Sequence, residues 1–139
     1  MTTDTQMSTD NTDKKQARPN LHEELTRKII GALFNVYNKL GYGYREKELQ
    51  RALAEEFKKL GLSFVRELHC NLIYEGKVIS RFYIDFLVEG KVVVELKVAD
   101  DFYKKHFDQV MTYLKTNHLR LGLLAIFTKQ KVLIKRIIN

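Results

Sequence analysis

The chain has 139 residues, of which 45% are hydrophobic and 29% charged, a balance typical of a globular protein rather than a disordered one. This length suits one domain with a real core. No apolar run approaches the length of a membrane span, and the first residues lack the apolar core of a signal peptide, so we expect a cytoplasmic protein. The single cysteine, Cys70, excludes an internal disulfide and a zinc-binding thiol cluster, and we interpret it as a packed or surface thiol.

The formal net charge of +7 lies entirely on residues 21–139, because lysines, arginines and aspartates cancel within residues 1–20. Those first residues are polar, show no apolar periodicity and end beside Pro19, so we expect a disordered tail followed by one domain over 21–139. A basic domain favours polyanions such as nucleic acid, although a solvated lysine-rich surface would carry the same charge.

Two helices are predicted first. Apolar residues recur at helical spacing from Leu21 to Leu40, and Gly41 ends that helix. A second apolar stripe predicts a helix from about Tyr44 to Leu60, which Gly61 ends.

The rest of the chain is mostly strand-like, with one more helix for which Asp100 is the expected N-terminal cap. The run Val92-Val93-Val94 is apolar on both faces, which indicates a central strand covered on both sides. The order ααβββαββ therefore predicts an α/β (α+β) fold, a mixed sheet with helices packed on it. The expected elements after Gly61 are strands at 63–74, 78–88 and 91–98, a helix at 101–116, and strands at 121–127 and 132–138.

Ionisable residues interrupt two of these apolar strands. Asp85 lies in the run Ile84–Val88, and Glu95 and Lys97 lie in the next strand. A buried carboxylate needs a cation, a donor or a metal, and two neighbouring carboxylates repel each other unless a cation joins them. Hard oxygen ligands suit Mg²⁺ or Mn²⁺, so this pattern points to a metal site.

The loop between these two strands decides whether such a site forms. A two-residue loop at Glu89-Gly90 would pair Asp85 with Val94 and send Glu95 to the opposite face. A three-residue loop that includes Lys91 would set Asp85 across from Glu95. We predict the three-residue loop, with Gly90 or Lys91 at positive φ.

Three further residues are candidates for this site. Glu46 shares a helical face with Leu49 and should point inward, although a carboxylate in the first turn of a helix is also favoured by the helix dipole. On the third helix, His106 and Gln109 are polar residues on a half-apolar face. Gln109 could orient a phosphate or Lys97, and His106 could act similarly, whereas satisfied hydrogen bonds on a helix face would explain both residues without a function.

These residues resemble the PD-(D/E)XK nuclease superfamily, which has an acidic residue on one strand and Glu-x-Lys on the next. The segment Leu40–Glu46 (LGYGYRE) resembles the signature of the GxxExxY protein family, a prokaryotic branch of that superfamily. Two positions depart from the patterns: Leu49 stands where the family name expects tyrosine, and Ile84 where the superfamily commonly has proline. Other similar segments, in order, are 83–88, 94–97, 106–109, 113–115, 122–124 with Phe127, and 135–138.

The resemblance implies a restriction-endonuclease-like core that hydrolyses phosphodiester bonds of DNA or RNA with Mg²⁺ or Mn²⁺. Asp85 and Glu95 would hold the metal, with Glu46 as an additional ligand. Lys97 would position the attacking water or help to deprotonate it, and would stabilise the developing phosphorane charge. Gln109 would support Lys97 from the helix.

Two other functions stay open. A binding or regulatory module on the same fold would bind nucleic acid without cutting it. A toxin or defence component would act on something other than a plain duplex. Because a domain of this size has no separate reading domain, specificity would come from a homodimer or a partner protein.

Overall fold

The computed structural model describes residues 21–139, and the tail expected over residues 1–20 lies outside this range. The elements follow the predicted order ααβββαββ. The helices are α1 (Glu23–Leu40), α2 (Glu46–Lys59) and α3 (Lys104–Thr116), and the strands are β1 (Phe64–Tyr74), β2 (Lys77–Val88), β3 (Val92–Val98), β4 (Leu121–Phe127) and β5 (Val132–Ile138). Within the described residues, none of the helices is both long and apolar enough to cross a membrane.

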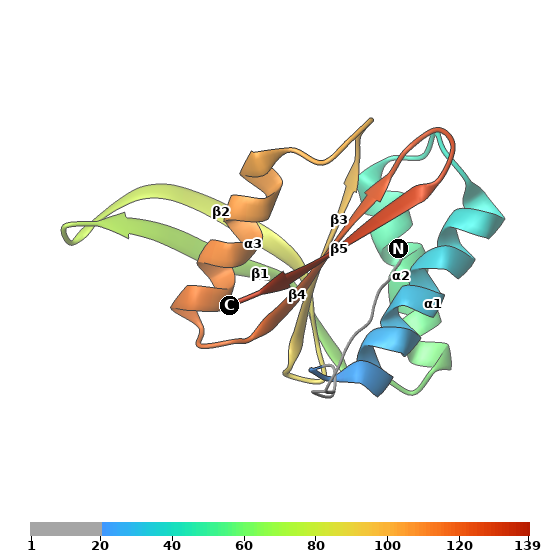
Figure 1. Cartoon of the computed structure of the whole chain (residues 1–139), viewed down its shortest axis with the longest axis horizontal. Helices are drawn as coiled ribbons and strands as arrows, with labels where there is room; N and C mark the ends of the chain where they lie inside the picture. Colours follow the sequence, from blue (N-terminus) through green and yellow to red (C-terminus); the bar gives the residue numbers. More distant parts are fainter. Residues whose placement is uncertain (1–20) are drawn as a thin grey trace, which may run out of the picture.

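The five strands form one mixed sheet in the order β1-β2-β3-β4-β5. Only the central pair, β3 and β4, is parallel, because α3 crosses over between these two strands. Helices α1 and α2 lie on one face of the sheet and α3 on the other (Figure 1). The strands β3 and β4 are therefore covered on both sides, as the run of three valines predicted, and the predicted fold class is confirmed.

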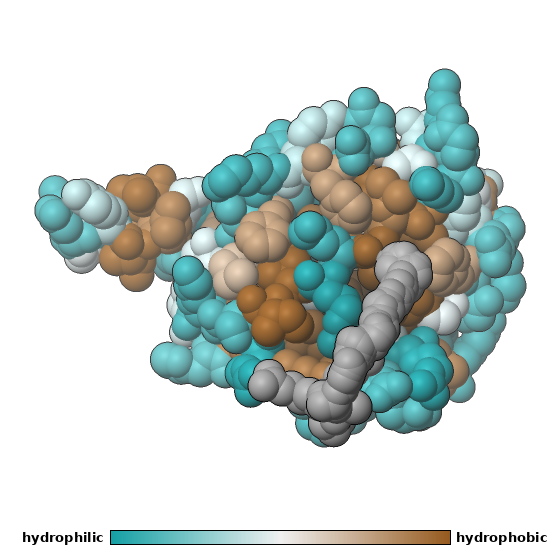
Figure 2. Space-filling view, viewed as in Figure 1, coloured by the Kyte–Doolittle hydropathy of each residue, from teal (hydrophilic) through white to brown (hydrophobic). Residues whose placement is uncertain are grey.

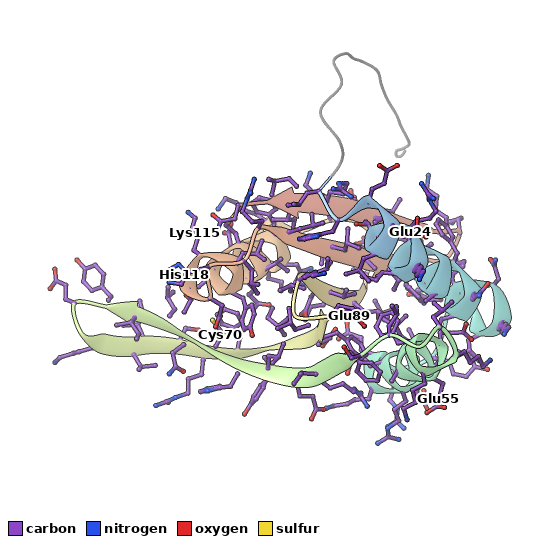
Figure 3. The ribbon with its side chains drawn as sticks, turned by 90° about the horizontal axis from the view of Figure 1, so that it is seen from below. Glu24, Glu55, Cys70, Glu89, Lys115 and His118 are labelled. Carbon is purple, nitrogen blue, oxygen red and sulfur yellow. The ribbon has the colours of Figure 1, made fainter. Side chains whose placement is uncertain are left out.

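Two buried clusters, one on each face, hold these layers together. The cluster beneath α1 and α2 includes Phe57, Phe86 and Phe127, which are among the largest fully buried side chains. The cluster beneath α3 includes Ile84, Val110 and Leu114. Cys70 is buried in this second cluster, on the α3 side of the β1–β2 hairpin (Figure 3), which agrees with a packed thiol.

Several boundaries differ by one to three residues from the sequence prediction, and two of them have a clear local cause. Helix α3 begins at Lys104 rather than Asp101, and Asp100 is not its cap. The Asp100 carboxylate instead accepts a hydrogen bond from the Tyr103 hydroxyl, which keeps this segment in a loop. The β1–β2 turn contains two residues, Glu75 and Gly76, both at positive φ, so Lys77 belongs to β2.

The β1–β2 hairpin extends well beyond the rest of the sheet. All residues from 72 to 81 are exposed, including Ile73 and Ile79, each about 60% exposed, and we call this segment the arm. Figure 2 shows apolar side chains gathered on the arm. The arm therefore exposes apolar side chains that the body of the domain does not cover.

Candidate active site

The β2–β3 hairpin has the register that the predicted site required. Val88 pairs with Val92, so the loop has three residues, Glu89, Gly90 and Lys91. This prediction is confirmed. Gly90 has a positive φ as expected, and Glu89 also does, which the sequence analysis did not predict.

Beyond the Phe86–Val94 pair, the two strands are joined by carboxylates rather than by backbone pairs. Glu95 Oε1 accepts a hydrogen bond of 2.9 Å from the Asp85 amide. In return, Asp85 Oδ2 accepts one of 2.8 Å from the Leu96 amide. The two acidic side chains therefore converge between β2 and β3, where each carboxylate bonds to the opposite strand.

Asp85 lies where the face alternation of β2 changes. Ile84 is buried in the cluster under α3, whereas Phe86 is buried in the cluster under α1 and α2. Residues two apart in a regular strand point to the same face, so β2 turns about its axis between them. On the neighbouring strand, Glu67 has a positive φ and interrupts the β1–β2 pairing at the same level.

Glu95 is buried and Asp85 is half-buried, and both lie beside one lysine. Glu95 is 1% exposed, and the Lys97 ammonium lies 3.2 Å from Glu95 Oε2. Residues 95 and 97 share one side of β3, as their spacing predicted. The structure thus brings together Asp85, Glu95 and Lys97.

Burial dominates the protonation of these groups. Burial raises the pKa of Asp85 to about 6, although the Leu96 amide and the charge of Lys97 favour the carboxylate form. Burial and the neighbouring charge of Asp85 raise the pKa of Glu95 to about 8, against the attraction of Lys97. Burial also disfavours the charged form of Lys97, but the surrounding carboxylates, with Glu95 the strongest, outweigh it and raise the pKa of Lys97.

Glu46, the third predicted ligand, is the first residue of α2 and lies beside the end of β3. Its Oε2 accepts a hydrogen bond of 2.8 Å from the Val98 amide. Its charge contributes to the raised pKa of Lys97, which places it near the acidic pair. Within residues 21–139, however, no three His, Cys, Asp or Glu side chains form a cluster that could hold a metal ion. Asp85 and Glu95 form a pair, and Glu46 is bound to the backbone beside it.

Gln50 is a residue of the site that was not predicted from the sequence. This α2 residue is 7% exposed, and its side-chain amide donates a hydrogen bond of 2.9 Å to Asp85 Oδ1. With the Leu96 amide, Gln50 therefore fixes both oxygens of Asp85. A signal was present in the sequence, because Gln50 lies one turn after Glu46 and one turn before Leu53, on the inner face of the helix.

The polar residues of α3 are less closely tied to the site. His106 Nδ1 is buried and has no hydrogen-bond partner among the described residues. Burial, together with the charges of Lys97 and Lys105, lowers the pKa of His106, so this ring lies near the site. Gln109 is half-buried and makes no side-chain hydrogen bond to any residue of the described range, so the structure does not join it to Lys97.

The donor set of the site suits a divalent cation. Asp85 and Glu95 offer hard carboxylate oxygens, and the pair repel each other in the buried site. A bound cation would offset this repulsion and the burial of both charges.

These features define a class of protein: a mixed-sheet α/β domain with a buried Asp/Glu pair and a lysine where two antiparallel strands separate. The sequence model of the PD-(D/E)XK nuclease superfamily matches residues 23–137. The chain therefore belongs to that superfamily, and this membership suggests nuclease activity. The superfamily assignment made from the sequence is confirmed.

One solved structure shows the same fold. The chain aligns with the crystal structure of SSO0001 with a TM-score of 0.52 and 20% sequence identity. The alignment covers 85% of this chain and 60% of SSO0001, so the chain spans less than two thirds of that protein's length. No curated protein matches the sequence significantly.

Proposed function

We propose that this protein is a metal-dependent nuclease that hydrolyses phosphodiester bonds of DNA or RNA. The observation that carries the proposal is the convergence of Asp85, Glu95 and Lys97 between β2 and β3. We also propose membership of the GxxExxY branch, on the segment Leu40–Glu46, and a location in the cytoplasm.

In this proposal, Asp85 and Glu95 would hold Mg²⁺ or Mn²⁺, and Glu46, whose Oε2 accepts a hydrogen bond from the Val98 amide, would be an additional ligand. When bound, such a cation would act as a Lewis acid, which would acidify a water molecule and polarise the phosphate oxygens. Gln50 and the Leu96 amide keep the Asp85 carboxylate in one orientation.

Lys97 provides the fixed positive charge. Its ammonium faces the buried acidic pair, where the local dielectric is low and charge stabilisation is strong. We propose that Lys97 positions the attacking water and stabilises the extra negative charge that develops on the phosphate oxygens in the transition state. Gln109 supports Lys97 from α3 in this proposal.

The decisive experiment measures cleavage of labelled single-stranded and duplex DNA and RNA with Mg²⁺, with Mn²⁺ and with a chelator. The wild-type protein should cut at least one substrate, and the chelator should abolish cleavage. Asp85→Asn and Lys97→Met should each lower the rate by roughly 10²–10³-fold, the scale expected for one electrostatic group in an active site.

Two exposed residues supply matched controls. Asp108→Asn on α3 and Lys28→Met on α1 change the same residue types outside the site, so cleavage should stay within about twofold of wild type. Cleavage that persists unchanged in both Asp85→Asn and Lys97→Met would contradict the assignment.

A second candidate is a nucleic-acid-binding or regulatory module without turnover. The observation that favours it is that Asp85, Glu95 and Glu46 already accept backbone hydrogen bonds, which a metal would have to compete with. Tight, salt-dependent binding without cleavage of any substrate would support this alternative. In either case we propose that residues 21–139 act as one domain and that a second copy or a partner protein adds specificity.

A further inference from the structure

A groove of about 350 Å³ lies between α2 and β1, outside the site described above. Arg51 and Lys58 line it from α2, and Arg66 lines it from β1. The acidic residue in its wall is Glu55, and the rest of the wall is apolar. The apolar wall consists of Ala52, Ala54 and Phe64.

The groove has more positive than negative charge. Lys58 pairs with Glu55 at 3.2 Å, and at the adjoining level Lys47 pairs with Glu67 at 2.8 Å. Arg51 and Arg66 form no ion pair with any residue of the described range. The pairing thus leaves two arginines without a direct ion pair among the described residues.

The Arg66 side chain packs against an aromatic ring. Its guanidinium lies over the Phe86 ring at 5.4 Å from the ring centroid, a cation–π contact. Its Nε is buried and has no hydrogen-bond partner among residues 21–139. The two terminal amino groups of a planar guanidinium can bind a phosphate through two parallel hydrogen bonds, so Arg66 in the groove wall is suited to that role.

The groove adjoins the acidic pair. Arg51 directly follows Gln50, whose side chain bonds to Asp85. Arg66 packs on Phe86, which directly follows Asp85, and it lies on the strand next to β2. Neighbouring strands are about 4.8 Å apart and Arg66 pairs with Phe86, so the backbone of Arg66 lies close to that of Asp85.

We propose that Arg51 and Arg66 form a phosphate subsite that binds the nucleic-acid backbone next to the phosphodiester being hydrolysed. The identity of the polyanion rests on the proposed nuclease function. In this arrangement the acidic pair acts on one phosphate, and the two arginines fix the strand through another phosphate. The subsite carries affinity and strand position and reads no base sequence.

The test compares nucleic-acid binding of three proteins in chelator, where no metal-dependent cleavage occurs, by fluorescence anisotropy of a labelled oligonucleotide. The double variant Arg51→Gln/Arg66→Gln should bind about tenfold more weakly than wild type, and its slope of log K against log salt should fall by about one, the value for one lost phosphate contact.

The matched control is Lys115→Gln/Arg120→Gln, which removes the same charge near the end of α3. Lys115 lies far from α2, on which Glu55 is labelled (Figure 3). This control should bind within about threefold of wild type, with an unchanged salt slope. Equal weakening of both double variants, or no binding by wild type, would overturn the subsite.

Two additions separate folding and catalysis from binding. Arg66→Lys keeps the charge and should bind between wild type and the double variant, and melting temperatures check that every variant folds. Loss of binding in the arginine variant without any wild-type cleavage would keep the subsite and reject the nuclease. If the wild type cleaves nucleic acid and the arginine double variant binds as tightly as the control, the nuclease function is supported and the subsite is rejected.

Discussion

At the residue scale, the acidic pair has two opposing effects on the stability of the fold. Asp85 and Glu95 bond to backbone amides across the β2–β3 gap, which stabilises the fold. The same burial that makes these bonds possible raises the pKa of both groups. The fold therefore carries an electrostatic cost that grows as these acids ionise.

This conflict predicts that stability falls as pH rises. Free carboxyl groups have pKa values near 4, whereas Asp85 and Glu95 in the folded protein have values of about 6 and about 8. Between about pH 4 and pH 8 the folded state therefore binds more protons than the unfolded state. The contribution of the protonated acidic pair to stability is complete below about pH 4 and is lost by about pH 8. The free energy of unfolding in chelator should decline by up to about 1.4 kcal/mol per pH unit for each group.

Denaturant unfolding from pH 5 to pH 8 measures this decline. Glu95→Gln should flatten most of it, because one acid of the pair no longer ionises. Glu55→Gln, an exposed change on α2, should leave the slope as in wild type. A wild-type protein that gains stability over this interval would show that the pair has ordinary or lowered pKa values.

The pair and Lys97 were predictable from the sequence because charged residues inside apolar strands are conspicuous. The bonds from each carboxylate to the opposite backbone were not, since they depend on the two strands separating after Phe86 and Val94. Gln50 was overlooked because a glutamine near an apolar stripe also suits a helix boundary facing water.

At the element scale, α3 packs tightly on the central strands through one glycine. A Cβ added to Gly122 of β4 would lie 2.6 Å from Val110 Cγ1 of α3. Real carbon atoms do not approach so closely, so the Val110 side chain, the helix or the strand must shift. Gly122 is therefore needed for close packing rather than for a special backbone conformation.

Gly122→Ala should lower the free energy of unfolding by about 1–3 kcal/mol, the range for overpacking a core. Gly31→Ala on α1 is the matched control, because its added Cβ meets no atom within 4 Å and alanine favours a helix. The control should raise stability by up to about 1 kcal/mol. Equal effects of the two substitutions in urea unfolding would contradict this account of the α3–β4 contact.

The order and type of every element followed from apolar periodicity, and turn glycines located most boundaries. The start of α3 did not follow, because Asp100 and Asp101 are good helix caps by composition but bond within the loop here. The change of face in β2 at Asp85 was also beyond the sequence, since it coincides with an irregularity on the neighbouring strand, where Glu67 has a positive φ.

At the scale of the whole molecule, the arm is an apolar extension that projects from the packed body of the domain. Its residues, 72–81, have neither helix above nor below them to bury their side chains. Strand β1 is also an outer strand of the sheet, with one edge not paired within the described residues. Such an edge pairs readily with another chain.

Ile73→Thr/Ile79→Thr should therefore reduce concentration-dependent self-association, measured by light scattering. The free energy of unfolding should change by less than about 0.5 kcal/mol, because both side chains are exposed and threonine suits a strand. Val65→Thr changes an exposed apolar residue outside the arm and should leave the association as in wild type. A wild-type protein that stays monomeric at every concentration would contradict this role of the arm.

The hydrogen bonds of the acidic pair also affect which inactivated protein suits a co-crystal with uncut substrate. Replacing Asp85 or Glu95 by alanine removes an acceptor that ties β2 to β3, so such a variant would distort the surface on which the substrate must lie. The Lys97 ammonium contacts only a side chain within residues 21–139. Lys97→Met is accordingly the better trap, since it removes the charge while the strands keep their spacing.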